Sequence, residues 1–220
     1  MFDLCTAPWR RKASGDVIVI RYADDTIVCF QHEHEAKAFL HDLQERMREF
    51  ELALHPAKTR LIRFGRHAAE QREKLGEGKP EIFDFLGFTH FCTRSRKWGS
   101  FVIGRKTIKK RMLRQLQAVK MELRKRMHDP IAETGTWLKQ MLKGHLNYYA
   151  VSGNSPSLWW YFNEVRWRWL KSLKRRSQRA FISWEKFTSI TDRFFPPIRI
   201  LHPLPCHRFD ARTRGKSPVR

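Results

Sequence analysis

The chain has 220 residues and a formal net charge of +22, from 44 Lys and Arg against 22 Asp and Glu. This length allows one or two domains with a sizeable hydrophobic core. The charge is segregated: residues 94–179 hold 22 basic and 4 acidic side chains, a net +18, whereas residues 1–93 hold 14 and 15, a net −1. Such a basic segment indicates a nucleic-acid-binding protein and disfavours a surface that mixes both signs evenly.

The cysteines exclude two further classes of protein. Cys5, Cys29, Cys92 and Cys206 are scattered and show no CxxC spacing. They predict neither a zinc site nor a disulfide framework, and we therefore expect a reducing, cytoplasmic setting. No apolar run approaches the roughly 20 residues that a membrane span needs, so no membrane partner is expected. No secretory signal is expected at the start of the chain.

The first predicted element is a β-hairpin. Residues 17–20 and 27–30 are two apolar, β-branched runs that predict buried strands, and Tyr22-Ala23-Asp24-Asp25 lies between them as the turn. Two adjacent carboxylates raise each other's pKa unless a cation separates them. Hard oxygen ligands suit Mg²⁺, so Asp24 and Asp25 are candidate magnesium ligands. The alternative is ordinary turn chemistry, in which Asp is common.

The next stretch predicts a helix and several short elements. Apolar residues at steps of three and four predict an amphipathic helix over residues 33–54, ended by His55-Pro56. A short strand is expected over residues 61–64, followed by a polar loop over residues 65–80. Residues 83–88, FDFLGF, predict another strand, in which Gly87 marks either a close backbone approach or a bulge.

The rest of the chain is predicted to be mainly helical. Residues 98–103 are expected to add a short strand, and helices follow over residues 108–127, 133–151 and 156–181. Ser155 is the expected N-cap of the third helix, with Pro156 at its first position. Most of the tryptophans are assigned to the core of these helices. Residues 182–220 are predicted to form an extended, Pro-rich basic arm, and the fold class as a whole is α+β.

Several motifs resemble the reverse transcriptase/maturase encoded by bacterial group II introns. Tyr22-Ala23-Asp24-Asp25 between apolar strands is similar to the catalytic hairpin of reverse transcriptases, and the resemblance continues through residues 15–88. Residues 144–149, GHLNYY, and residues 175–178, RRSQ, resemble the maturase-specific domain X. The resemblance implies the C-terminal portion of a palm over residues 1–103, a helical thumb or domain X over residues 104–181, and the arm over residues 182–220.

The same resemblance implies what lies outside this sequence. The fingers and the strand with the first metal-binding aspartate would precede residue 1 in the family. No paired cysteines of an HNH endonuclease are present in the sequence, so DNA cleavage is not predicted.

The resemblance implies an RNA-directed DNA polymerase that also assists splicing of its intron RNA. Its cofactor would be Mg²⁺, and its partners would be an RNA template, a DNA primer, deoxynucleoside triphosphates and the intron RNA. Asp24 and Asp25 would be catalytic and bind the metal. The residues implied at the nucleotide or primer are Tyr22, Ala23, Lys58, Leu86 and Gly87. The cations assigned to RNA are Arg105, Lys106, Lys109, Lys110, Arg114, Arg166, Lys174, Arg175 and Arg176.

Two alternatives remain open at this stage. The chain is either a polymerase whose first half lies in a separate chain or was lost in a truncated gene copy, with little or no activity of its own, or a non-catalytic RNA-binding module that serves as a splicing cofactor. A defence-type or retron-like reverse transcriptase is disfavoured by the domain X resemblance of residues 137–180.

Overall fold

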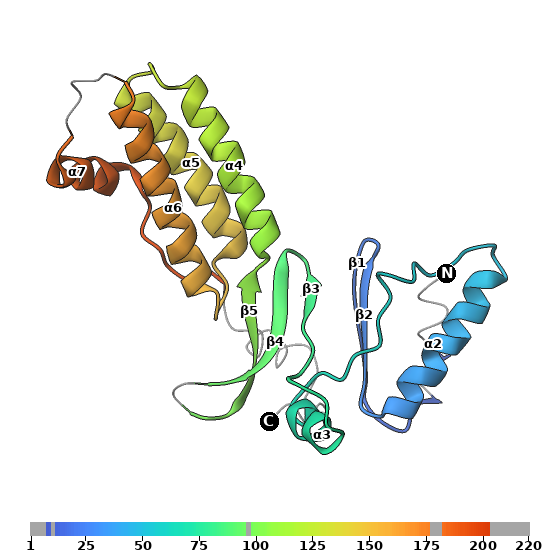
Figure 1. The fold of residues 1–220 in the computed structure, drawn as a ribbon. Coiled ribbons are helices and arrows are strands. Elements are labelled where there is room, and N and C mark those ends of the chain that lie inside the picture. Colours follow the sequence, from blue (N-terminus) through green and yellow to red (C-terminus); the bar gives the residue numbers. More distant parts are fainter. Residues whose placement is uncertain (1–7, 10–11, 96–97, 177–181, 203–220) are drawn as a thin grey trace. The chain divides into compact units, whose positions relative to one another are not determined.

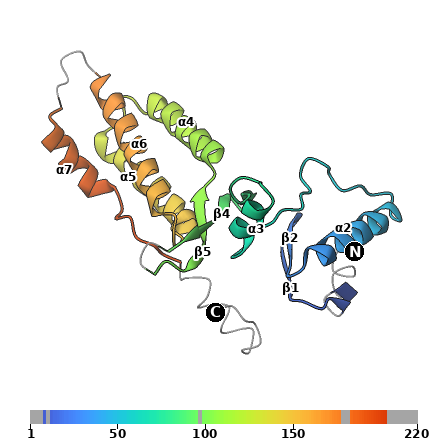
Figure 2. The same cartoon turned by 60° about the horizontal axis from the view of Figure 1, so that its bottom comes forward.

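The computed structural model describes residues 8–9, 12–95, 98–176 and 182–202. The chain divides into two compact units, residues 1–64 and 65–220, which are described separately (Figures 1 and 2). Helices and two small antiparallel sheets occur together, which confirms the α+β class. The boundary expected near residue 103 does not coincide with this division. Within the described residues, no helix has both the length and the apolarity needed to cross a membrane.

The first unit is a hairpin with one helix packed on it. Strands β1 (Val17–Tyr22) and β2 (Asp25–Phe30) pair antiparallel, from Val17 opposite Phe30 to Tyr22 opposite Asp25. Helix α2 (Glu33–Arg48) covers one face, where the Phe30 and Phe39 ring centroids lie 5.2 Å apart. The predicted hairpin is therefore confirmed.

Three expectations for the first unit are wrong. The strands are not buried, because α2 covers only one of their two faces and no residue of β1 or β2 is fully buried. The helix ends at Arg48, well before residue 54, and Glu51 follows with a left-handed φ of 57°. Residues 61–64 form no strand.

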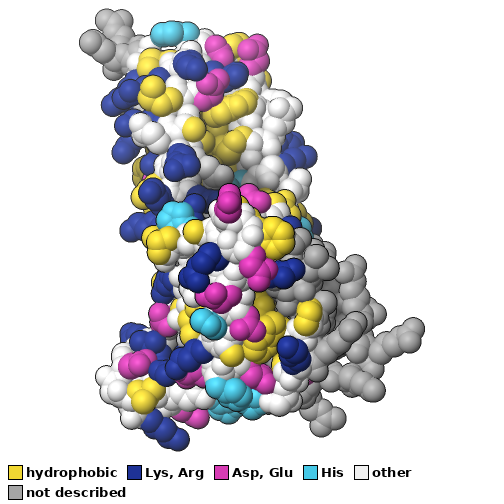
Figure 3. All heavy atoms as spheres, turned by 90° about the vertical axis from the view of Figure 1, so that its right-hand side faces the viewer, with side chains coloured by type: hydrophobic (Ala, Val, Ile, Leu, Met, Phe, Trp, Pro, Cys, Tyr) yellow, Lys and Arg dark blue, Asp and Glu magenta, His cyan; other side chains and the backbone are white. Residues whose placement is uncertain are grey.

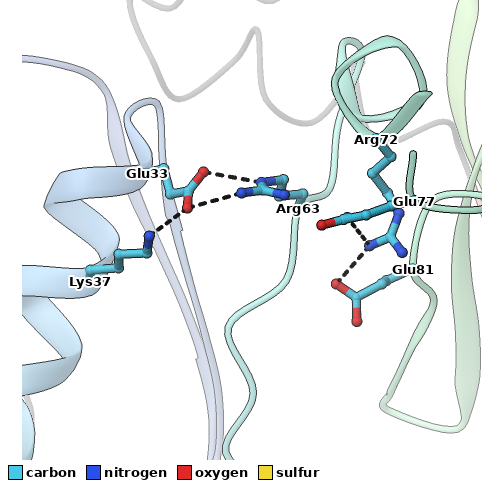
Figure 4. Close-up of polar contacts among 6 residues, drawn as sticks. All are labelled: Glu33, Lys37, Arg63, Arg72, Glu77 and Glu81. Carbon is cyan, nitrogen blue, oxygen red and sulfur yellow. Dashed lines mark hydrogen bonds and ion pairs between the residues drawn. The ribbon is translucent and has the colours of Figure 1, made fainter. Parts of the chain in front are cut away.

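An ion-pair cluster holds the segment of Arg63 against the start of α2 (Figure 4). The Arg63 guanidinium donates two hydrogen bonds to the Glu33 carboxylate, at 3.0 and 3.2 Å, and Lys37 Nζ lies 2.8 Å from the same group. These two cations lower the pKa of Glu33 to about 2. The segment of Arg63 forms no strand, and these side-chain contacts hold it in position instead.

The second unit begins with a short helix and a three-stranded sheet. Helix α3 (Ala68–Lys74) lies within the stretch expected to be a loop, and Arg72 forms ion pairs with Glu77 at 3.3 Å and Glu81 at 3.4 Å (Figure 4). Strands β3 (Phe83–Phe85), β4 (Phe88–Arg94) and β5 (Phe101–Thr107) follow in antiparallel order β3-β4-β5.

The sheet corrects two predictions. FDFLGF is not one strand, because the chain reverses at Leu86-Gly87 and Phe85 pairs with Phe88. The strand expected over residues 98–103 instead runs from Phe101 to Thr107, where it pairs with β4 along its whole length.

Helices α4 (Lys109–Lys125), α5 (Ile131–Tyr149) and α6 (Ser155–Lys174) form a bundle and confirm the three predicted helices (Figures 1 and 2). The part of the third predicted helix over residues 177–181 lies outside the described residues. The core is a set of fully buried side chains contributed by all three helices: Leu116, Leu138, Leu142, Leu158, Tyr161, Val165 and Trp169.

A buried histidine lies within this core. The His145 ring stacks on Tyr161 with centroids 3.9 Å apart and also contacts Tyr149. Burial lowers the pKa of His145 to about 4. Burial is also the largest of the causes that raise the pKa of Tyr161 to about 12. His145 is therefore a neutral member of the core at neutral pH.

The ends of α6 and the following segment differ from the sequence predictions. Asn154, not Ser155, is the N-cap, and Pro156 falls in the first turn. Part of the expected arm is helix α7 (Trp184–Phe194), whose Ser183 hydroxyl accepts a hydrogen bond from the Lys186 amide at 3.3 Å. Residues 203–220 of that arm lie outside the described residues.

The assignment of most tryptophans to the core is also wrong. Trp169 is fully buried, and Trp9 and Trp137 are partly buried. The other five are exposed: Trp98, Trp159, Trp160, Trp167 and Trp184. Leucine, tyrosine and phenylalanine fill most of the remaining bundle core, so most of the indoles are left at the surface.

Candidate functional site

The acidic pair lies at the tip of the β1–β2 hairpin. Tyr22 and Asp25 form the last strand pair, and Ala23 and Asp24 make the two-residue turn. Ala23 has a φ of 51°, an uncommon conformation for a residue with a side chain. The Arg21 Nε donates a hydrogen bond of 3.2 Å to the Ala23 carbonyl and supports this turn. Both aspartates are exposed.

The alternation of side chains along the strands decides which face of the hairpin carries the Asp25 carboxylate. Phe30 lies on the face that packs against α2, and the pairing puts Tyr22 and Asp25 on the opposite face with Ile20 and Ile27. Tyr22 is 64% exposed and Ile20 is 42% exposed. The face that carries Asp25 therefore has exposed side chains, some of them apolar.

The chemistry of the tip fits part of a magnesium site. Two exposed carboxylates supply the hard oxygen ligands that Mg²⁺ prefers. Among the described residues, however, no group of three or more His, Cys, Asp or Glu side chains is arranged to hold a metal ion. Asp24 and Asp25 would thus supply only some of the ligands of such an ion.

The Leu86-Gly87 turn is a second unusual feature. Both residues have positive φ, 47° and 82°, as a type I′ hairpin turn requires. Leucine rarely adopts this conformation, so tertiary contacts must stabilise it. The Tyr148 hydroxyl donates to the Leu86 carbonyl at 2.9 Å, and the Ile108 amide donates to the Gly87 carbonyl at 3.1 Å.

The surroundings of Gly87 also explain why glycine is present. A Cβ atom there would lie 3.3 Å from Arg111 Nη1 and 3.4 Å from atoms of Tyr148 and Tyr149. The Phe88 ring lies parallel to that of Tyr148, with centroids 6.0 Å apart. The bundle therefore encloses this turn, and the two tyrosines of the GHLNYY motif do so directly.

Lys58 lies in an exposed turn that follows α2, and its amide donates to the His55 carbonyl at 3.0 Å. The structure thus brings Tyr22, Ala23, Asp24 and Asp25 together at one tip. Leu86 and Gly87 belong to the other unit.

Three of the predicted RNA-binding cations share one groove. Lys106, Lys109 and Lys110 line it together with Trp160, where β5, α4 and α6 meet. Arg114 and Lys174 are exposed outside it. Arg105 is half-buried in β5, where burial lowers the pKa of its guanidinium, and Arg176 is partly buried.

Arg166 and Arg175 have different surroundings. The Arg166 guanidinium donates to the Thr191 hydroxyl at 2.6 Å and lies 3.6 Å from the Asp192 carboxylate, so it binds α7. Arg175 lines a second groove, between α4 and α6.

Sequence reasoning missed most of this second groove. Its other cations include Lys120 and Arg124 of α4 and Lys171 of α6, and Trp167 is part of its lining. The i, i+4 spacing of Lys120 with Arg124 and of Lys171 with Arg175 was the available signal. Figure 3 shows Lys and Arg side chains beside exposed hydrophobic ones on one face of the helical bundle.

Comparison with known families gives one match. Residues 1–90 match the family model described as reverse transcriptase (RNA-dependent DNA polymerase). The matched stretch contains the Asp24-Asp25 tip and the Leu86-Gly87 turn and ends before the helical bundle. No curated protein and no solved structure shows a significant match to the chain.

Proposed function

We propose that the chain is part of an RNA-directed DNA polymerase of the group II intron type. The observation that carries the proposal is the exposed Asp24-Asp25 pair at the tip of an antiparallel hairpin, inside the stretch that matches the reverse transcriptase family. On this proposal residues 1–103 correspond to the end of the palm, and residues 104–181 to the thumb or domain X.

Asp24 and Asp25 would hold Mg²⁺ at the hairpin tip. The bound ion would activate a primer 3′-hydroxyl and neutralise charge on the nucleotide phosphates. Tyr22, on the same face as Asp25, would lie under the incoming nucleotide or the primer end. Leu86 and Gly87 would contact the primer strand, and Lys58 would counter phosphate charge.

Polymerisation would require metal ligands beyond these two aspartates. We propose that the remaining ligands come from another segment or chain, and that extension by this polypeptide alone is weak or absent. A partner contributing a third carboxylate would complete the two-metal arrangement.

The second candidate function is that of a non-catalytic splicing cofactor that binds intron RNA in the cytoplasm. The net +18 of residues 94–179 favours it, together with the cation-lined grooves of the bundle. This role would use the bundle and would not need the hairpin tip.

Primer extension on an RNA template in the presence of Mg²⁺, with a reverse transcriptase segment that supplies the remaining metal ligands added in trans, tests the polymerase proposal. Asp24→Asn removes a proposed metal ligand, and Asp42→Asn, an exposed position on α2, is the matched control. We expect Asp24→Asn to abolish extension and Asp42→Asn to retain it. Extension that survives Asp24→Asn would overturn the metal assignment, and RNA binding without any extension even with the added segment would favour the cofactor role.

A further inference from the structure

The groove between α4 and α6 carries a charge that the described residues do not neutralise. It encloses about 360 Å³ and is lined by five cations, Lys120, Arg124, Arg168, Lys171 and Arg175, and by one carboxylate, Glu164. Arg168 already forms an ion pair with that carboxylate. Among the described residues, the other four cations have no ion-pair partner.

Some neighbouring cations are paired. Arg126 and Lys125 both contact Glu122, at 2.8 and 3.6 Å, and Arg166 contacts Asp192. What the groove adds is that it gathers four cations without an ion-pair partner among the described residues, two from each of its walls. Like charges at i, i+4 repel each other at a small cost in free energy, as Lys120 with Arg124 and Lys171 with Arg175 do, although a position near the C-terminal end of a helix is itself favourable for a cation. An anion bound in the groove would remove this cost.

The position of the two groove walls is fixed by direct contacts. The Ser172 hydroxyl donates to the Leu123 carbonyl at 3.1 Å, which joins α6 to α4 at the floor of the groove. Leu123 and Leu173 are buried beside it. Lys120, Arg124 and Lys171 therefore project from helices that are packed together, and Arg175 is the C-cap residue of α6.

An aromatic side chain accompanies the cations. Trp167 is 50% exposed, and its ring contacts Trp184 of α7 with centroids 5.4 Å apart. A half-exposed indole anchored by a second indole offers a flat surface on which an unpaired base can stack. In a duplex the bases are already stacked on each other, so this surface would have no base to receive.

We propose that the α4–α6 groove binds a single-stranded RNA segment, with its phosphates on Lys120, Arg124, Lys171 and Arg175 and a base stacked on Trp167. Cations along a groove combined with an exposed aromatic are the features by which proteins bind single strands without sequence preference. The choice of RNA rests on the proposed function. The site itself does not use the Asp24-Asp25 tip.

Binding of a labelled uridine oligomer of about 12 nucleotides, a length within the usual range of single-strand sites, tests the proposal. Fluorescence anisotropy is measured with the full chain across a salt series. Lys171→Ala/Arg175→Ala removes two groove cations, and Lys139→Ala/Lys143→Ala removes an i, i+4 pair from α5 outside the groove as the matched control. We expect the groove variant to bind roughly tenfold more weakly and to lose about 1.4 from its salt slope, a loss that the control does not show.

Trp167→Leu tests the stacking component, and Trp159→Leu, exposed on the same helix outside the groove, is its control. If the base stacks on Trp167, Trp167→Leu should bind the single strand roughly tenfold more weakly, and Trp159→Leu should not. Trp167→Phe should recover the binding of the single strand. Binding of an RNA duplex of equal length should be the same for Trp167→Leu and the wild type. Circular dichroism checks that each variant is folded. If Trp167→Leu does not fold, the Lys171→Ala/Arg175→Ala variant still tests the proposal.

Equal binding by the groove and control variants would overturn the proposal, as would equal loss of duplex and single-strand binding on Trp167→Leu. Because the readout is binding and not synthesis, failure of the groove is distinguishable from failure of the polymerase proposal. Primer extension that depends on Asp24 can occur whichever result the groove gives.

Discussion

The Tyr148 hydroxyl donates a hydrogen bond of 2.9 Å to the carbonyl of Leu86, 62 residues earlier in the chain. This bond joins α5 to a hairpin turn in which leucine has a positive φ. Packing and hydrogen bonding from the bundle thus stabilise a backbone conformation that the local sequence disfavours. The turn lies within the stretch that matches the reverse transcriptase family.

Removal of this hydrogen bond is expected to loosen the turn. Tyr148→Phe keeps the ring that stacks on Phe88 and deletes only the donor, so we expect a loss of about 1 kcal/mol in the free energy of unfolding. Hydrogen exchange of the Leu86 to Phe88 amides should become faster. Unchanged exchange in this segment would show that the turn does not depend on the bond.

A side chain at residue 87 is expected to be strongly unfavourable. Gly87→Ala introduces a Cβ at a φ of 82° and 3.3 Å from Arg111, so unfolding free energy should fall by about 1–3 kcal/mol. Gly144→Ala is the control, because that helical position has open space around it. It should stabilise by up to about 1 kcal/mol. Equal effects of the two substitutions in chemical denaturation would contradict the geometry.

The buried amide of Asn154 is expected to contribute strongly to stability. Its Oδ1 accepts from the Thr107 amide at 2.9 Å, and its Nδ2 donates to the Tyr149 carbonyl at 2.8 Å. Asn154→Ala leaves buried groups without partners, so we expect a loss of about 2 kcal/mol or more in thermal unfolding. Asn163→Ala, exposed on α6, should change little. A small effect of Asn154→Ala would mean that Thr107 and Tyr149 find other hydrogen-bond partners.

Acid is expected to destabilise the bundle through His145. Its pKa is lowered from 6.5 to about 4, so the unfolded chain binds the proton more readily than the folded one. The contribution of the neutral ring is fully present above pH 6.5 and is lost as pH falls towards 4, by on the order of 3 kcal/mol. The measurement is unfolding free energy against pH for the wild type and His145→Phe. The variant should lack this dependence; parallel curves would exclude His145 as its source.

The elements that sequence predicted well are those whose periodicity reflects burial. An apolar stripe predicted the helix over residues 108–127, and Met112, Leu116, Val119 and Leu123 of that stripe are buried in α4. In α6 the core stripe runs through Leu158, Tyr161, Val165 and Trp169. Trp159 and Trp167 lie off this stripe and are exposed. The prediction assigned tryptophans to the core because of their residue type and not because of their position on the helix, and for this reason it was wrong for Trp159 and Trp167.

The missed features depend on contacts between distant segments. Nothing local favours a left-handed leucine at residue 86, since Tyr148 and Ile108 supply the stabilising bonds. Likewise, the α4–α6 groove exists only once two helices pack together. The adjacent carboxylates of Asp24 and Asp25, in contrast, were visible in the sequence because the hairpin that carries them is local.

The bonds from Tyr148 and Ile108 to the Leu86-Gly87 turn have a mechanical consequence. The turn is hydrogen-bonded both to α5 and to the residue preceding α4. A tilt of the bundle would therefore displace the turn as well. The Leu86-Gly87 turn and the helical bundle would thus move as one body.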